Sequence, residues 1–167
     1  RGDASTDAEG EDIANAARVG IARAELQAGR PAQAIAAAQS VPAGFVFELE
    51  FQDDLANRGR LANKMWQFVR DRGSIAVAPT WRVSDPRIPQ EVADPNEFAP
   101  QDAAYANDRG IPYVIQLKYP GYDAPVRLAS KLEADYIQAE AEGTASQLAL
   151  IVARRAANGQ APYAGGV

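Results

Sequence analysis

The sequence predicts an α+β fold in which helices dominate. Three observations support this prediction: helical periodicity near both ends of the chain, alternation of apolar and polar residues in two short segments, and a proline-rich stretch between them. With 167 residues the chain is long enough to bury a core, so we expect residues 1–167 to form a single domain or a fragment. Within it we expect a helical hairpin over 1–42, strands and long loops over 43–124, and a second helical hairpin over 125–167.

The first hairpin is predicted from two helical segments, 10–28 and 31–40. Apolar residues recur at helical spacing in the first segment and define its expected buried stripe: Ile13, Ala17, Ile21, Ala24 and Ala28. Gly29 and the proline two residues later suit the end of one helix and the start of the next. Gly29, Ala34 and Ala38 also match the spacing of a tetratricopeptide-type hairpin, in which small side chains let two helices approach closely.

Two strands are predicted, at 45–51 and 113–118, because apolar and polar residues alternate there. Glu48 and Glu50 share the polar face of the first strand. Such a pair could act as the acid and nucleophile of a glycosidase, but it is more simply the solvated side of an amphipathic strand.

The region 52–112 between these strands is expected to be mostly irregular. "LANKMWQFVRDR" is interpreted as a short strand or helix, and "SIAVAPTWRV" as extended chain. "SDPRIPQEVADPNEFAPQD" is expected to be a loop, because its four prolines remove backbone donors.

The second hairpin is predicted to consist of helices over 126–142 and 145–157. Asp123 is expected to cap the first helix, whose expected buried stripe is Leu128, Leu132, Tyr136 and Ala139. Thr144 and Gln147 have the spacing of a capping box for the second helix.

Glycines are expected to end both helices of this hairpin, at Gly143 and Gly159. We also expect Glu140 to play a structural part, pairing with Arg154 or Arg155 across the hairpin.

The composition argues against several functional classes. The chain has no cysteine and no histidine, which removes thiolate chemistry, the commonest general base and the commonest metal ligands. We therefore expect no enzyme activity, no catalytic residues, no metal and no cofactor. The formal net charge of -5 and the lack of a basic stripe argue against nucleic-acid binding. The start at Arg1, without a signal peptide or a lipid-anchor cysteine, is interpreted as a processed product or a fragment.

Four segments stand in order along the chain: "NAARVGIARAELQAGRPAQAIAAAQSVPAGFVFELEF", "WRVSDPRIP", "QLKYPGYDAPVRLASKLEADYIQAEA" and "ALIVARRAANGQAPY". Together they resemble a central-to-late portion of the RagB/SusD family of nutrient-uptake outer-membrane lipoproteins. The resemblance implies a non-catalytic protein at the bacterial cell surface that binds an oligosaccharide or peptide nutrient and caps a TonB-dependent transporter. It also implies tetratricopeptide-like hairpins. The matching motif residues are expected to be structural: Arg127, Glu133, Glu140 and Arg155.

Aromatic residues in or beside the irregular region are the candidate ligand-binding residues: Trp81, Tyr105, Tyr113 and Tyr122. Sugars stack their apolar faces on such rings, and we expect at least two of the four to line one groove. The alternative for each ring is a place in the core. Two alternatives for the whole chain stay open, a structural protein that self-assembles on a SusD-like scaffold and a hydrolase that uses carboxylates alone.

Overall fold

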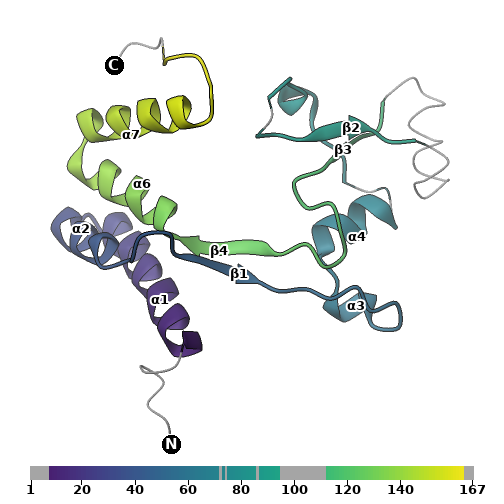
Figure 1. Ribbon diagram of the computed structural model, residues 1–167, viewed down its shortest axis with the longest axis horizontal. Coiled ribbons are helices and arrows are strands. Elements are labelled where there is room, and N and C mark those ends of the chain that lie inside the picture. The colour runs from purple at the N-terminus through teal and green to yellow at the C-terminus, as the bar shows by residue number, and fades with distance from the viewer. Residues whose placement is uncertain (1–7, 72, 74, 86, 95–111, 164–167) are drawn as a thin grey trace, which may run out of the picture. The chain divides into compact units, whose positions relative to one another are not determined.

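The computed structural model describes residues 8–71, 73, 75–85, 87–94 and 112–163, and it mixes helices with small two-stranded sheets, as the sequence predicts (Figure 1). The chain divides into two compact units. The helical unit comprises Arg1–Glu48 and Arg127–Val167, and the loop unit comprises Leu49–Val126. Both predicted helical hairpins therefore belong to the same unit.

The helical unit begins with α1 (Ala8–Gln27) and α2 (Pro31–Gln39), which confirms the two helices predicted at 10–28 and 31–40. Gly29 has a φ of 69°, a left-handed conformation that ends α1. The backbone amide of Gly29 donates to the carbonyl of Leu26 at 3.0 Å, and the backbone amide of Arg30 donates to the carbonyl of Glu25 at 2.9 Å. These two bonds satisfy carbonyls at the end of α1 and turn the chain directly into α2.

The stripe predicted for α1 was wrong. Val19 and Ala22 are fully buried, whereas Ile13 and Ile21 are 55% and 53% exposed. The other members of the predicted stripe, Ala17, Ala24 and Ala28, are also exposed. The helix carries apolar residues at helical spacing on two of its faces, and the face with Val19 and Ala22 is the one that packs.

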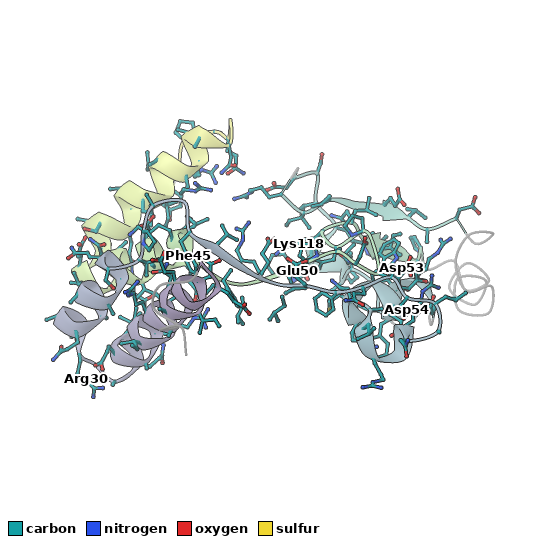
Figure 2. All side chains as sticks on the ribbon, turned by 60° about the horizontal axis from the view of Figure 1, so that its bottom comes forward. Arg30, Phe45, Glu50, Asp53, Asp54 and Lys118 are labelled. Atoms are coloured by element: carbon teal, nitrogen blue, oxygen red, sulfur yellow. The ribbon has the colours of Figure 1, made fainter. Side chains whose placement is uncertain are left out.

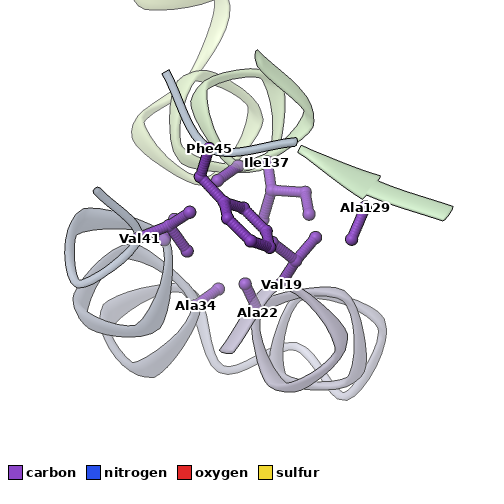
Figure 3. Packing of buried hydrophobic residues seen from close by; sticks show 9 residues of the cluster. Val19, Ala22, Ala34, Val41, Phe45, Ala129 and Ile137 are labelled. Atoms are coloured by element: carbon purple, nitrogen blue, oxygen red, sulfur yellow. The ribbon is translucent and has the colours of Figure 1, made fainter. Parts of the chain in front are cut away.

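The core of the helical unit surrounds Phe45, the residue before β1 (Val46–Leu49) (Figure 3). Its ring lies among Val19, Val41 and Ile137, and alanines fill the remaining positions: Ala22, Ala34, Ala38, Ala129 and Ala134. The last of the larger residues, Ile137, comes from α6 (Lys131–Glu142), which packs against both α1 and α2.

The strand β1 pairs with β4 (Val126–Ser130), where a helix was predicted. The helix begins only after Ser130, whose extended backbone (φ -157°) and hydroxyl oxygen, 3.3 Å from the amide of Glu133, cap α6. The expected cap at Asp123 was therefore wrong. Of the predicted stripe only Ala139 is buried, and Leu128 and Tyr136 are 45% and 42% exposed. The buried face of α6 consists of Ala134, Ile137 and Ala139.

Gly143 ends α6 and starts α7 (Thr144–Ala157), with a φ of 109°. The C-terminal ends predicted for the two helices, at 142 and 157, are thus confirmed. Thr144, however, is the first residue of α7, and no side chain caps this helix. Gly159 (φ 64°) ends α7, with the amide of Gln160 bonded to the carbonyl of Arg155 at 2.9 Å.

The ion pair predicted for Glu140 was wrong, because this residue is exposed and makes no ion pair with Arg154 or Arg155. Glu133, seven residues earlier in α6, has a structural contact instead. Arg23 of α1 donates to the carboxylate of Glu133 and, at 2.8 Å, to the carbonyl of Leu128.

The loop unit contains α3 (Arg58–Leu61), α4 (Lys64–Arg70), a 3-10 turn η1 (Pro79–Trp81), β2 (Gln90–Val92) and β3 (Val114–Gln116). The strands β2 and β3 are antiparallel, with Gln90 opposite Gln116. The strand predicted at 113–118 is confirmed in β3, whereas β2 lies in the stretch predicted as loop. Four buried residues form the core of this unit: Val69, Ala93, Tyr113 and Ile115.

Candidate functional site

Asn63 fixes the start of α4 in the loop unit. Its side chain is almost fully buried, and its Oδ1 accepts hydrogen bonds from the amides of Met65 (2.9 Å) and Trp66 (3.4 Å). Its Nδ2 donates to the carbonyl of Ala124 at 2.7 Å, and its backbone amide donates to the carbonyl of Tyr122 at 2.6 Å. One residue therefore caps α4 and ties it to the segment that follows β3.

Trp81 closes the 3-10 turn η1, and its backbone is held on both sides. Its amide donates to the carbonyl of Ala78 at 2.8 Å. The side-chain amide of Gln90, in β2, donates to the carbonyls of Trp81 (2.9 Å) and Val83 (3.0 Å). Trp81 is nevertheless 62% exposed, so the backbone is fixed while the side chain faces solvent.

Tyr119 lies in the turn after β3 and is positioned by Gln116. The side chain of Gln116 accepts from the amide of Tyr119 at 2.9 Å and donates to its carbonyl at 3.2 Å. The ammonium group of Lys118, labelled in Figure 2, lies 5.4 Å from the centre of the Tyr119 ring. This distance is within the range of a cation–π contact.

These segments surround a pocket of about 330 Å³, which we call the Trp81 pocket. It combines two aromatic rings, three other apolar side chains, two cations and one amide: Met65, Trp81, Arg87, Ile88, Pro89, Gln116, Lys118 and Tyr119. An aromatic, partly apolar hollow with a few polar groups at fixed positions is the usual composition of a small-ligand site.

Of the predicted ligand residues, Trp81 lies in this pocket. Tyr113 is only 5% exposed, and its hydroxyl lies 3.0 Å from the carbonyl of Ile75 and 3.2 Å from that of Val69. Its ring has no face for a ligand, so its assignment as a binding residue is corrected to a core role. Tyr105 lies outside the described residues.

Tyr122 is held in a separate polar cluster of the loop unit and does not line the Trp81 pocket. The guanidinium of Arg58 lies 3.8 Å from the centre of its ring, and its hydroxyl donates to Asp71. Burial, followed by the hydrogen bond to Asp71, raises the pKa of Tyr122 to about 12.

Tyr119, which directly follows the strand predicted at 113–118, was not among the predicted site residues. The signal that identifies it is the turn sequence Pro120-Gly121 directly after it. A residue beside such a turn leaves the sheet, and its ring is then available to a loop surface.

The carboxylates considered for catalysis do not contribute to this pocket. Glu48 is half-buried, Glu50 is exposed, and neither lines the Trp81 pocket. Within the part of the chain that the structure describes, no three acidic side chains gather closely enough to hold a metal ion.

The helical unit has a second hollow of about 340 Å³ between α6 and α7, lined partly by Asp135 and Glu142. Both acids are engaged within the unit. Asp135 pairs with Lys131 at 2.9 Å, and Gln138 donates to Glu142 at 2.6 Å. Hydrogen bonds from Gln138 and Ser146 lower the pKa of Glu142. This hollow has no aromatic lining residue, so it lacks a stacking surface.

None of the described helices is both long enough and apolar enough to cross a membrane. Comparison with known proteins gave no assignment: no family model matches the chain, and no curated protein or solved structure matches it.

Proposed function

We propose that this chain is a non-catalytic binding protein on a SusD-like scaffold and that its Trp81 pocket takes an oligosaccharide. The exposure of Trp81 carries the proposal. Trp81 is 62% exposed on a backbone fixed by Gln90, so its ring offers a preorganised surface on which a sugar can stack. Tyr119 supplies a second ring in the same pocket.

The resemblance to the RagB/SusD family extends this proposal to the cellular setting. The chain would then act at the bacterial outer membrane, where it takes up an oligosaccharide or peptide nutrient and caps a TonB-dependent transporter. An oligosaccharide is favoured over a peptide because flat aromatic rings complement the apolar faces of sugars.

The same proposal includes tetratricopeptide-like hairpins in the helical unit. Its support is the packing of α2, in which Ala34 and Ala38, the two small residues at the tetratricopeptide spacing, are fully buried. Small residues at these positions let α1 and α2 approach closely.

Binding of a panel of neutral and acidic oligosaccharides to wild-type protein and to Trp81→Ala, measured by isothermal titration calorimetry, tests the proposal. Loss of the stacking surface should weaken binding about 10-fold to 100-fold, as expected for about 1.5–3 kcal/mol of apolar burial. The melting temperature should change little, because an exposed side chain contributes little to stability.

Tyr136→Ala is the matched control, since Tyr136 is an aromatic residue of the helical unit that is 42% exposed and lies outside the pocket. It should bind the oligosaccharide like the wild type. Equal binding by Trp81→Ala and wild type would contradict the proposal, and so would the absence of binding to every oligosaccharide of the panel.

A second candidate function is self-assembly through the helical unit. The observation that favours it is the outer face of α1, where Ile13 and Ile21 are more than half exposed. A second copy that covers this face would make the mass in light scattering rise with concentration, and Ile21→Glu should abolish that rise. A constant monomer mass would contradict this candidate.

A further inference from the structure

The Trp81 pocket is positively charged although the chain is acidic. Two of its lining residues are cations, Arg87 and Lys118, and none is a carboxylate. In the whole sequence 22 acidic residues outnumber 17 basic ones, so the lining runs against the overall balance. A pocket of this kind attracts anions more strongly than the rest of the protein does.

Lys118 is the cation available to a ligand. It is exposed, and it makes no ion pair with any other residue that the structure describes. Its ammonium group lies 5.4 Å from the centre of the Tyr119 ring, and Gln116 fixes the backbone of Tyr119. The positive charge is therefore held beside a stacking surface.

Arg87 contributes differently, because Asp85 already neutralises it. Nη2 of the Arg87 guanidinium donates to the Asp85 carboxylate at 2.6 Å, and the backbone amide of Arg87 donates to the same carboxylate at 2.9 Å. The pair has no net charge, but it holds the arginine in a fixed orientation at the pocket. Discrimination by charge should then depend on Lys118.

From this arrangement we infer that the ligand is an acidic oligosaccharide whose uronic-acid carboxylate pairs with Lys118, an inference that rests on the proposed function. In a hexuronic acid the carboxylate projects from the edge of the pyranose ring. A sugar that stacks on Trp81 therefore keeps its carboxylate outside the stacked face, where the ammonium group of Lys118, which lines the same pocket, can reach it. Lys118 is the specificity-determining residue.

The test compares two ligands that differ in charge and by one methyl group per carboxyl, an oligogalacturonate and its carboxyl methyl ester. A hyaluronan fragment and its methyl ester form a second pair. Titration of the wild type should give about threefold to fivefold tighter binding of each free acid, the upper part of the range expected for one exposed ion pair. The difference should shrink as salt is added, because salt screens exposed charges.

Lys118→Gln should bind acid and ester within about twofold of each other, with the affinity for the ester unchanged. Arg60→Gln is the matched control: it removes the same charge from an exposed position on α3 outside the pocket and should keep the preference.

Equal binding of acid and ester by the wild type would overturn the inference and leave the proposed function standing. A preference for the acid that survives in Lys118→Gln would overturn the assignment to Lys118. Tighter binding of a sulfated than of a carboxylated oligosaccharide would overturn the choice of carboxylate. If no oligosaccharide binds at all, the proposed function fails and this inference fails with it.

Discussion

Replacement of Asn63 tests how the loop unit holds its pocket. Asn63 caps α4, which supplies Met65 to the Trp81 pocket, and it bonds through Nδ2 to Ala124. In Asn63→Ala both interactions are lost. Loss of an N-cap costs about 0.5–2 kcal/mol. The carbonyl of Ala124 loses its donor as well, at a further cost of about 1–2 kcal/mol. We therefore expect Asn63→Ala to lower the free energy of unfolding by about 1.5–4 kcal/mol.

Asn63→Ser separates the two contributions. The serine hydroxyl can still cap α4, but it is too short to reach the carbonyl of Ala124, so we expect about half of the loss. Asn57→Ala is the matched control, because Asn57 is exposed at the start of α3 and its side chain caps no helix. Its cost should stay within about 0.5–1 kcal/mol.

Urea unfolding followed by tryptophan fluorescence is the assay. The sequence contains two tryptophans, Trp66 and Trp81, and both lie in the loop unit, so the signal reports on this unit. With a denaturant slope of about 2 kcal/mol per molar, the midpoint for Asn63→Ala should fall by about 0.75–2 M. The reasoning is refuted if Asn63→Ala is as stable as Asn57→Ala, or if serine at position 63 costs as much as alanine.

Two further outcomes are expected. Phe45→Ala should lower the free energy of unfolding by about 3–5 kcal/mol, measured by far-ultraviolet circular dichroism, because the neighbouring alanines are too small to fill the space left by the ring. Ile21→Ala is the control at an exposed position and should cost less than about 1 kcal/mol. Equal losses in the two variants would contradict the packing around Phe45. The raised pKa of Tyr122, about 12, means that the unfolded chain loses this phenol proton first as pH rises above 10. The stability that the neutral Tyr122 contributes is present below pH 10 and is lost between pH 10 and about 12, so the difference in stability between wild type and Tyr122→Phe should narrow over that range, whereas a constant difference would contradict the assignment.

The helices near both ends of the chain could be predicted because the residues that end them are local sequence signals. Gly29, Gly143 and Gly159 each adopt a positive φ at a helix end, which glycine tolerates best. Which face of α1 would be buried was not predictable in the same way. Apolar residues recur at helical spacing on both sides of that helix, and only the approach of α2 and α6 selects the side that carries Val19 and Ala22.

The mistake at β4 has a different cause. Val126 to Ser130 was read as the start of a helix, although Ser130 and Glu133 have the spacing of a capping box and mark where α6 begins. The strand itself forms because β1 lies beside it, and β1 is distant in sequence. Long-range pairing of this kind leaves little trace in a short segment.

The candidate site was predicted in part. Trp81 is exposed at a pocket, and its role as a ligand residue stays a prediction. Tyr113 faces the interior instead, in the cluster that it forms with Val69, Ala93 and Ile115. Side-chain direction in and beside short strands depends on register, and a shift of one residue reverses it.

The helical unit is discontinuous along the chain, and this has a consequence for synthesis on the ribosome. Ala34, Ala38 and Phe45 emerge early, but their partners Ala129 and Ile137 follow only after the loop unit has been made. At about 5–20 residues per second, the intervening stretch of about 80 residues takes about 4–16 s to translate. During that time the first two helices have no α6 to pack against, and the last core residue of the loop unit, Ile115, is made before α6 begins at Lys131. The loop unit should therefore fold before the helical unit does. The helices α1 and α2 are then the part of the nascent chain that a ribosome-bound chaperone would need to protect.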